Sequence, residues 1–243
     1  MDLMLDVSNR SISILIVDND KKIREGLSTK FISLGYTMFL ASTGKEGLNL
    51  FTKEQPDLII LDLLLPDLNG NSFCRKIREK SQVSIIIITA LDNISDRIIG
   101  LESGADDYIV KPFSPKELEV RIKNVLKRTN KELPKPFKKS QNVFYNDNLA
   151  INIDKKSILY KNVLIKLTNI EFTLLRFLIE NSGKVLSRKI ILDNIWGYIP
   201  ERDIDTRVVD VYISRLRSKI EENSTTPNFI LTVRGTGYMF QKY

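Results

Sequence analysis

Residues 58–70 read LIILDLLLPDLNG, and this stretch decides the fold of the first half of the chain. The continuous aliphatic run Leu58–Leu61 is typical of a strand that is buried on both faces of a parallel sheet. Asp62 follows the run directly, and a proline and a glycine then break the pattern before a helix-like segment begins. A strand with a polar end that leads into a helix is the repeating unit of α/β proteins.

The same unit recurs on either side of this stretch. The strand candidates are Ile12–Val17, Thr37–Ala41, Leu58–Leu61, Ile85–Ile88 and Tyr108–Val110. Helix-like segments follow them at Lys21–Leu34, Lys45–Glu54, Gly70–Lys80, Ile94–Ser103 and Ser114–Arg128. This alternation predicts an α/β fold, a doubly wound five-stranded parallel sheet with helices on both faces.

Length and composition place the chain among ordinary folded proteins. It has 243 residues, of which 42% are hydrophobic and 28% are charged, so we expect two domains with packed cores. No apolar run reaches the ~18–20 residues of a membrane span, and we therefore expect no membrane partner. The acidic start MDLMLDVSNR argues against a secretory signal.

Two residue types are scarce, and their scarcity excludes several kinds of site. A single cysteine, Cys74, excludes an internal disulfide and a cysteine zinc site. The chain has no histidine, which excludes Ser-His-Asp catalysis, histidine metal sites and the role of a phospho-histidine donor. Any chemistry must therefore use carboxylates, hydroxyls, Lys and Arg.

The net charge of +7 is confined to the second half of the chain. Residues 1–130 carry 18 Lys and Arg against 18 Asp and Glu, whereas residues 131–243 carry 19 against 12. A domain with such an excess of positive charge is expected to face a polyanion such as DNA.

The composition of the sequence changes at residues 129–141 (TNKELPKPFKKSQ). This stretch is rich in Lys and Pro and is interpreted as a linker. The elements expected beyond it are short antiparallel strands at 143–167, helices at Asn169–Asn181, Ser187–Trp196 and Asp205–Glu221, and a hairpin of Phe229–Val233 and Tyr238–Gln241. Three helices and a terminal hairpin predict an α+β winged helix-turn-helix domain over residues 142–243.

Polar residues close the predicted strands of the first half. They are Asp18, Asn19, Asp62, Thr89 and Lys111. Because the carboxyl ends of parallel strands meet at one edge of a sheet, these side chains should converge on one pocket. Clustered carboxylates favour Mg²⁺, beside which Asp62 can attack phosphorus while Lys111 and Thr89 hold the phosphoryl oxygens. The alternative is that these residues only terminate strands.

An enzyme is a second class of function that this pattern allows. Phosphatases of the haloacid dehalogenase type also use a strand-end aspartate and Mg²⁺. They usually place another aspartate two residues after the nucleophile, where this chain has Leu64. We therefore expect that the protein is not an enzyme.

The motifs ILIVDND, LDLLLPDLNG, IIIITA and GADDYIVKPF resemble those of the receiver domain of response regulators, a flavodoxin-like fold, over residues 12–128. The resemblance implies that Asp62 accepts a phosphoryl group from a sensor histidine kinase, with Mg²⁺ as the cofactor. It further implies a metal site of Asp18, Asn19, Asp62 and the main-chain carbonyl of Leu64, phosphoryl contacts from Thr89 and Lys111, and Tyr108 as the switch aromatic.

The family usually has an acid where this chain has Asn19. An amide oxygen can coordinate a metal but brings no formal charge, so the departure implies weaker Mg²⁺ binding and altered phosphorylation. It is also the main support for a third class of function, a phosphorylation-independent DNA-binding regulator whose receiver is only a dimerisation scaffold.

The resemblance also implies a homodimer that forms on phosphorylation, through the face made by the fourth helix, the fifth strand and the fifth helix. The charged residues of this face are Arg97, Asp106, Asp107, Glu117, Arg121 and Arg128. The expected interchain pairs are Arg97–Glu117, Asp107–Arg121 and Asp106–Arg128. The alternative is solvated surface charges worth about 0–1 kcal/mol each.

Residues 206–220 predict a basic amphipathic helix. The apolar stripe at helical spacing, expected in the core, is Val209, Ile213, Leu216 and Ile220. The residues outside that stripe, which can reach DNA phosphates or base edges, are Arg207, Tyr212, Ser214, Arg215 and Arg217. At the tip of the hairpin, Arg234 is placed for a phosphate or the minor groove. An ordinary basic surface helix is the alternative.

The segments LTNIEFTLLRFLIENSGKVLSR, VVDVYISRLRSKI and VRGTGYMF resemble the DNA-binding domain of the OmpR/PhoB family. The promoter contacts that this resemblance implies are Arg207, Tyr212, Ser214, Arg215, Arg217, Thr232, Arg234 and Tyr238. Asp210 is expected to be structural and Trp196 to lie in the core. The loop Trp196–Asp205 is a candidate contact to RNA polymerase.

The resemblance covers almost the whole chain and implies a phosphorylation-controlled, DNA-binding transcriptional regulator. VKPFSPKELEVRIKNVLKR and GYIPERDIDTRVVDVYISRLRSKIEE are most similar to the RpaB-type regulators of cyanobacteria and algal plastids. The abundance of Ile, Asn and Lys, with no transit peptide, suggests the plastid (chloroplast) stroma, and the bacterial cytoplasm is the alternative.

Overall fold

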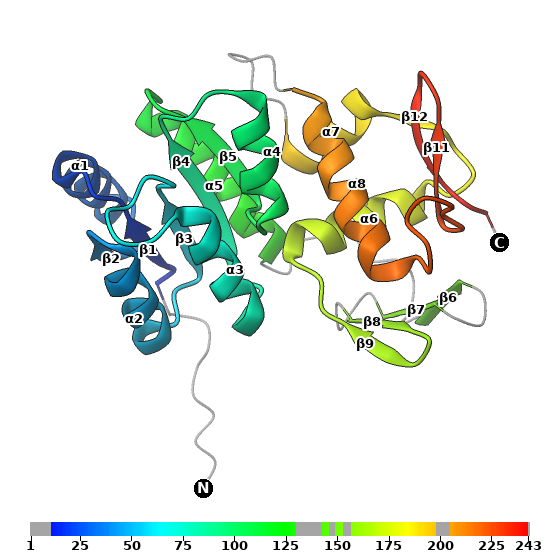
Figure 1. Ribbon diagram of the computed structural model, residues 1–243, viewed down its shortest axis with the longest axis horizontal. Coiled ribbons are helices and arrows are strands. Elements are labelled where there is room, and N and C mark those ends of the chain that lie inside the picture. Colours follow the sequence, from blue (N-terminus) through cyan, green and yellow to red (C-terminus); the bar gives the residue numbers. More distant parts are fainter. Residues whose placement is uncertain (1–10, 130–141, 146–148, 153–156, 198–204, 243) are drawn as a thin grey trace, which may run out of the picture. The chain divides into compact units, whose positions relative to one another are not determined.

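The computed structural model describes residues 11–129, 142–145, 149–152, 157–197 and 205–242 (Figure 1). Two units are described below, each by itself: the first comprises residues 11–129, and the second comprises the described residues from 142 to 242. Within these described ranges, no helix has the length and apolar character needed to cross a membrane.

Residues 11–129 alternate strands and helices. The strands are β1 (Ser13–Val17), β2 (Thr37–Ala41), β3 (Leu58–Leu61), β4 (Ser84–Thr89) and β5 (Asp107–Val110). The helices are α1 (Lys21–Ile32), α2 (Gly44–Glu54), α3 (Gly70–Lys80), α4 (Ile94–Glu102) and α5 (Pro115–Thr129). The predicted linker thus begins with the last residue of α5, and residues 130–141 lie outside the described residues.

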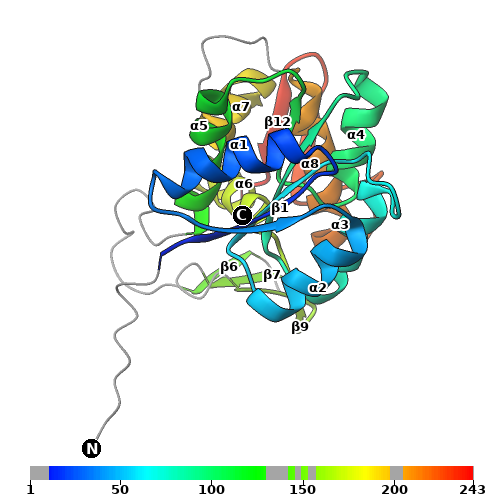
Figure 2. The same ribbon diagram turned by 90° about the vertical axis from the view of Figure 1, so that its left-hand side faces the viewer.

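The five strands form one parallel sheet in the order β2-β1-β3-β4-β5. The strands β1, β3 and β4 are buried at every residue, as their aliphatic runs predict. The edge strand β2 is fully buried only at Ala41. Figure 2 shows α1 on one face of the sheet and α2 and α3 on the other. The predicted doubly wound fold is therefore confirmed.

The register of the sheet brings the polar strand ends together. The last residues of β1 and β3 pair with each other, and so do the last residues of β4 and β5. The residues that come next, Asp18, Asp62 and Lys111, therefore lie at the same edge of the sheet as Thr89, which ends β4.

Side-chain caps fix where the first three helices begin. Asp20, Thr43 and Asn69 are the N-cap residues of α1, α2 and α3, and each side chain accepts a hydrogen bond from a main-chain N–H of the first turn. Such caps contribute roughly 1 kcal/mol each. Helix α1 therefore begins directly after the polar end of β1, and α3 directly after the loop that carries Asp62.

The second unit has two small antiparallel sheets and three helices. Strands β6 (Asn142–Tyr145), β7 (Leu149–Asn152), β8 (Ser157–Tyr160) and β9 (Val163–Ile165) form the first sheet in this order. The helices are α6 (Asn169–Glu180), α7 (Arg188–Trp196) and α8 (Arg207–Ile220). The second sheet contains β10 (Leu186–Ser187), β12 (Gly237–Phe240) and β11 (Ile230–Val233). The predicted winged helix-turn-helix architecture is confirmed.

The core of the second unit contains the apolar stripe of α8. The predicted core residues Val209, Ile213, Leu216 and Ile220 are at most 1% exposed, and Trp196 is 3% exposed. The carboxylate of Glu221, directly after α8, accepts hydrogen bonds of 2.8–2.9 Å from three successive main-chain N–H groups, those of residues 228–230. The end of α8 is therefore tied to the start of the hairpin.

Two helical glycines provide a test of packing in the first unit. A methyl group on Gly26 of α1 would meet nothing within 4 Å, whereas one on Gly47 of α2 would lie 2.8 Å from Val17 and 3.0 Å from Phe73. We expect Gly26→Ala to stabilise the unit by about 0.5–1 kcal/mol, because alanine favours a helix. We expect Gly47→Ala to destabilise it by roughly 1–3 kcal/mol through overpacking. Hydrogen exchange of the β1 and β3 amides measures both effects, and lower protection in Gly26→Ala would contradict the first.

Candidate functional site

Two carboxylates and one ammonium group lie together at the carboxyl edge of the five-stranded sheet. Lys111 Nζ lies 2.7 Å from Asp18 Oδ2 and 2.7 Å from Asp62 Oδ2. The side chains of Lys111, Asp18 and Asp62 are 17%, 0% and 5% exposed. The ammonium group therefore bridges two buried carboxylates that would otherwise repel each other.

The other oxygen of each carboxylate accepts a main-chain hydrogen bond. Asp18 Oδ1 accepts from Asp20 N at 2.8 Å, and Asp62 Oδ1 accepts from Leu64 N at 3.0 Å. The turn after β1 and the loop after β3 are thus tied to the carboxylates that they carry. Each carboxylate consequently has a fixed orientation before any ligand binds.

Burial and pairing act on the protonation of this group in opposite directions. Burial raises the pKa of Asp18, against the hydrogen bond from Lys111, and the net shift is upward. Burial lowers the pKa of Lys111, but the hydrogen bonds to the two carboxylates outweigh it, and the net shift is again upward. Lys111 is therefore a permanent positive charge near neutral pH.

The oxygen atoms at this edge fit a hard cation. Asp18 and Asp62 supply carboxylates, and Asn19 and Leu64 add an amide and a main-chain carbonyl in the adjoining turns. Mg²⁺ commonly uses one or two protein carboxylates and keeps several waters, so this donor set suits it. In the part of the chain that the structure describes, no three Asp, Glu or Cys side chains form a metal cluster. Asp20, the next residue after Asn19, caps α1 through its Oδ1.

Thr89 and Tyr108 both contact Leu91, in the loop after β4. Thr89 is fully buried, and its Oγ1 accepts a hydrogen bond from Leu91 N at 3.4 Å. Tyr108 OH donates to Leu91 O at 2.6 Å, and the residue is 6% exposed. Tyr108, the residue predicted as the switch aromatic, is therefore buried in this structure and is joined to Thr89 through Leu91.

Asp106, predicted at the dimer interface, is buried in the first unit. Its carboxylate is 2% exposed and lies 2.9 Å from Arg78 NH2. It also accepts a hydrogen bond from Ile85 N at 2.8 Å. Within one molecule, the Asp106 carboxylate is therefore buried and held by Arg78, and its interchain pair with Arg128 stays a prediction.

The other residues predicted at the dimer interface differ in exposure. Asp107 and Arg121 are buried, at 8% and 6% exposed, and Arg97 and Glu117 are half-buried. The side chain of Arg128 lies outside the described residues. The pairs Arg97–Glu117 and Asp107–Arg121 stay predictions.

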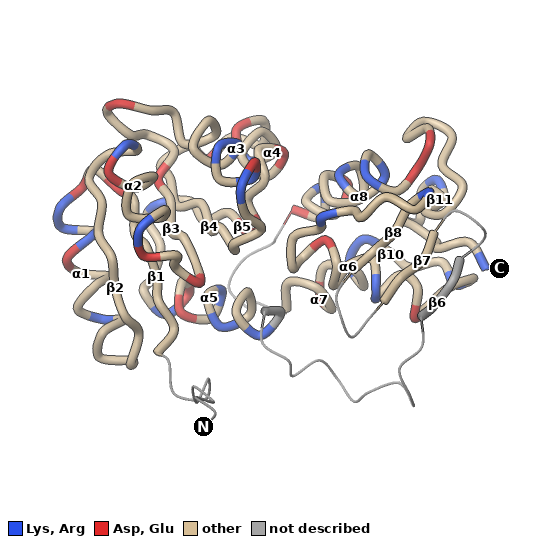
Figure 3. Tube along the Cα trace, turned by 90° about the horizontal axis from the view of Figure 1, so that it is seen from below, with Lys and Arg blue, Asp and Glu red and all other residues tan. Residues whose placement is uncertain are grey.

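In the second unit, α8 carries a row of basic residues along its length (Figure 3). Arg207 and Ser214 are exposed on the side away from the apolar stripe. Arg207 Nε lies 3.0 Å from Asp205 Oδ2, with 57% of the Arg207 side chain exposed. An α-helix that presents such residues fits the major groove of DNA.

Arg217 joins α8 to the hairpin. Its NH2 donates to Thr232 Oγ1 at 2.8 Å and to the carbonyl of Ile230 at 2.5 Å. Its guanidinium group also lies 5.6 Å from the ring centroid of Tyr238. Helix and hairpin therefore form one continuous surface, with the exposed Arg234 at the tip of the hairpin.

Asp210 has the structural role that we predicted. Its Oδ1 accepts hydrogen bonds of 2.7 Å from both Arg188 Nε and Tyr238 OH. The guanidinium group of Arg188 lies 5.1 Å from the ring centroid of Tyr238. Sequence analysis missed Arg188, the first residue of α7, because only tertiary pairing brings it to α8 and the hairpin.

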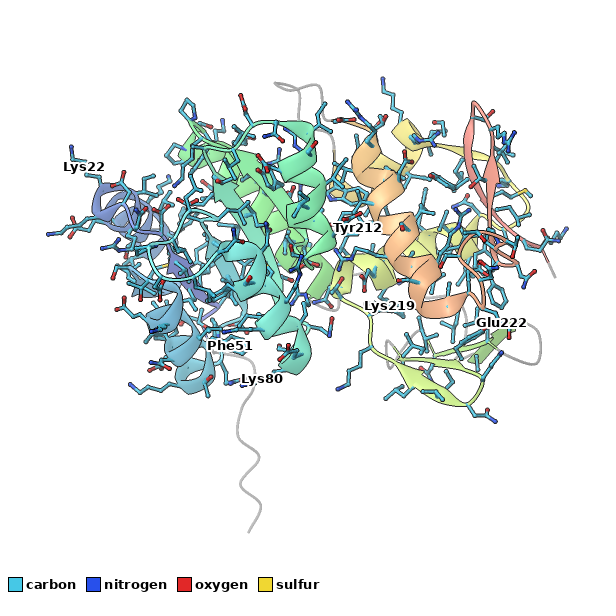
Figure 4. The ribbon with its side chains drawn as sticks, in the orientation of Figure 1. Lys22, Phe51, Lys80, Tyr212, Lys219 and Glu222 are labelled. Atoms are coloured by element: carbon cyan, nitrogen blue, oxygen red, sulfur yellow. The ribbon has the colours of Figure 1, made fainter. Side chains whose placement is uncertain are left out.

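Tyr212 is not on this surface. It is fully buried, and its ring packs against Trp196 with centroids 5.0 Å apart. The expectation that Tyr212 is exposed for DNA is therefore wrong. Although Tyr212 lies outside the apolar stripe of α8, Trp196 covers its ring. Figure 4 shows Tyr212 and Lys219 projecting from different turns of α8.

Arg215 also forms an ion pair inside the second unit. Its NH2 lies 2.7 Å from Oε1 of Glu171, whose other oxygen lies 2.7 Å from Lys219 Nζ. Glu171 is fully buried and caps α6 through the N–H of Thr168. Arg215 and Lys219 thus neutralise a buried charge and anchor α8 to α6, so the structure gives Arg215 no free group for DNA.

Comparisons with known proteins agree with both units. Residues 14–123 match the family described as response regulator receiver domain, and residues 161–240 match transcriptional regulatory protein, C terminal. A probable transcriptional regulator, ycf27 of Guillardia theta, is 49% identical over 242 residues, covering 100% of this chain and 94% of the relative. DrrB, a Thermotoga maritima OmpR/PhoB homologue of known structure, is 34% identical over 96% of this chain and 100% of its own, with a TM-score of 0.50.

The chain belongs to the OmpR/PhoB family of response regulators. A further solved structure, that of a RitR mutant, is 26% identical, covers 96% of this chain and 100% of its own, and has a TM-score of 0.73. The predicted resemblance to RpaB-like plastid regulators is confirmed by the ycf27 relatives. As a member of the OmpR/PhoB family, the chain is a transcriptional regulator rather than an enzyme.

The pairing of Tyr238 predicts its titration in this OmpR/PhoB regulator. Burial raises the pKa of Tyr238 to about 12, and the hydrogen bond to Asp210 acts in the same direction. Because this pKa exceeds the usual ~10, the contribution of Tyr238 to stability is present below pH ~10 and is lost as the pH rises towards the folded value.

Ultraviolet titration measures this ionisation as the difference between the wild type and Tyr238→Phe. We expect Asp210→Asn to move the pKa of Tyr238 back towards ~10, since the charged acceptor is removed. Ionisation of Tyr238 near its usual value in the wild type would show that the contact with Asp210 does not persist in solution.

Proposed function

We propose that this response regulator is switched by phosphorylation of Asp62 and that it acts by binding promoter DNA through α8 and the hairpin. The observation that supports the first part most directly is the bridge from Lys111 Nζ to Asp62 Oδ2 and Asp18 Oδ2, at 2.7 Å each. A nucleophilic carboxylate beside a fixed cation suits the attack on an anionic phosphoryl group.

In the proposed reaction, a carboxylate oxygen of Asp62 forms a bond to phosphorus while the bond from phosphorus to a donor nitrogen breaks. The donor is a phospho-histidine of a sensor kinase, since the chain itself has no histidine, and the leaving imidazole takes up a proton from solvent. Lys111 and Thr89 hold the phosphoryl oxygens. Mg²⁺, held by Asp18, Asn19, Asp62 and the Leu64 carbonyl, would neutralise negative charge during transfer.

The DNA-binding surface combines α8 with the hairpin. We assign promoter contacts to Arg207, Ser214, Arg217, Thr232 and Arg234. Tyr238, which the resemblance placed among these contacts, is 5% exposed and shares Asp210 with Arg188, so we assign both a positioning role beneath this surface. Arg207 and Arg234 are the exposed cations of this set. The positive charge of the second half supports a polyanionic partner.

Further partners follow from the family. We propose a homodimer, formed on phosphorylation, whose interface includes Arg97, Asp106, Asp107, Glu117, Arg121 and Arg128. The loop Trp196–Asp205, whose residues 198–204 lie outside the described residues, is proposed to contact RNA polymerase. We propose the plastid stroma as the location, and the ycf27 relatives support the plastid.

A phosphorylation-independent regulator is the second candidate function. The observation that favours it is Asn19, which is exposed and which brings an amide and no charge to the predicted metal site. The two candidates differ in whether Asp62 carries phosphate.

The decisive experiment for the first candidate is covalent labelling of the full chain. With Mg²⁺ and a small phosphodonor, we expect intact-mass spectrometry to detect one added phosphoryl group in the wild type and none in Asp62→Asn. Asp57→Asn is the matched control, because Asp57 lies just before the other end of β3 and binds Ser13 N and Oγ at 2.8 and 2.9 Å. A label that survives in Asp62→Asn, or a wild type without label, would favour the phosphorylation-independent regulator.

Binding to duplex promoter DNA at several salt concentrations tests the DNA-binding surface. We expect Arg207→Ala and Arg234→Ala each to lower affinity and to reduce the slope of log K against log salt by about 1, as for the loss of one phosphate contact. Lys161→Ala is the control, since Lys161 is exposed on the turn between β8 and β9 and pairs with Glu222. An unchanged slope in both arginine variants would remove these residues from the surface.

A further inference from the structure

One carboxylate connects the loop after Asp62 to the start of a different helix. Asp67 lies between β3 and α3, and its Oδ1 accepts a hydrogen bond from Gly44 N at 2.7 Å. Its Oδ2 accepts from Lys45 N at 2.9 Å. Both N–H groups belong to the first turn of α2, where unpaired amides favour a negative charge. Asp67 therefore ties two segments that are separate in the sequence.

The loop that carries Asp67 is also closed at its base. Leu64 and Asn69 form an isolated antiparallel bridge. The tip of the loop packs on the start of α2, since a methyl group on Gly44 would lie 2.8 Å from Leu68 Cβ. The tip thus has two attachments, one polar through Asp67 and one apolar through Leu68.

Helix α2 is in turn packed against the end of β1. A methyl group on Gly47 would lie only 2.8 Å from Val17, the residue before Asp18. The loop with the Leu64 carbonyl is therefore linked through α2 to the strand that carries Asp18 and Asn19. The Asp62 carboxylate depends less on this link, because Lys111 holds its Oδ2, although Leu64 N of the loop donates to its Oδ1.

We propose that Asp67 is a positioning residue for the metal site, where it keeps the main-chain carbonyl of Leu64 in place for Mg²⁺. This inference rests on the proposed phosphorylation of Asp62. It assigns Asp67 an effect on the affinity for Mg²⁺ and not on the reactivity of the Asp62 carboxylate.

The two hydrogen bonds that Asp67 accepts from the start of α2 persist across the neutral pH range. The hydrogen bond from Lys45 N, together with the one from Gly44 N, lowers the pKa of Asp67 below its usual value. The carboxylate stays charged and keeps both helix amides as donors. A neutral amide at this position has one acceptor oxygen, so it can keep only part of the tie.

The test is an NMR titration of the full chain with Mg²⁺, followed at the amides of the first unit. We expect Asp67→Ala to weaken Mg²⁺ binding roughly tenfold, the low end of the effect of losing an outer-shell partner of a metal site. Asp67→Asn should lie between Asp67→Ala and the wild type. At saturating Mg²⁺, the rate of phosphoryl labelling should stay close to that of the wild type in both variants.

Glu46→Gln is the matched control. Glu46 is a second exposed carboxylate at the start of α2, but it accepts from Ser42 N at 2.6 Å and Ser42 Oγ at 2.9 Å and has no bond to the loop. The Glu46→Gln substitution should leave the affinity for Mg²⁺ unchanged. Wild-type affinity in Asp67→Ala, or an equal loss in Glu46→Gln, would overturn the proposal. If the wild type neither binds Mg²⁺ nor takes up label, the proposed function itself fails, and the inference fails with it.

Discussion

Lys111 places one positive charge between two carboxylates that the sheet buries side by side, and the first unit is arranged around this requirement. Two ionised carboxylates in a site with little solvent would raise each other's pKa and destabilise the fold. The parallel register makes their proximity unavoidable, because Asp18 and Asp62 follow paired strand ends. The bridging ammonium group offsets the repulsion between Asp18 and Asp62.

The second unit also buries a carboxylate, and there the neutralising cations come from α8. Glu171 is fully buried, and Arg215 and Lys219 of α8 neutralise it. The cations of α8 therefore fall into two sets. One set anchors the helix to α6, and the other, which includes Arg207, faces outward. The positive charge of α8 is thus partly structural, and a count of its basic residues overstates the number that can contact DNA.

The sequence predicted what depends on local pattern and missed what depends on distant partners. The aliphatic runs, the polar strand ends and the apolar stripe of α8 are periodic signals, and the structure agrees with them. The burial of Asp106 by Arg78 and of Tyr212 by Trp196 depends on pairs that have no local signature. For the same reason the two-residue strand β10, which pairs only with β12, was not predicted.

The amide at Asn19 changes the net charge of the receiver site. Two carboxylates and one ammonium leave one net negative charge among the buried groups, and Asn19 adds a dipole but no charge. A divalent cation at this edge is then attracted less by charge and relies more on the geometry of neutral donors such as the Leu64 carbonyl. Neutral donors act only at short range, so the position of the loop between β3 and α3 matters more here than in a site with a third carboxylate. The attachment of that loop to α2 is therefore part of the electrostatics of the site.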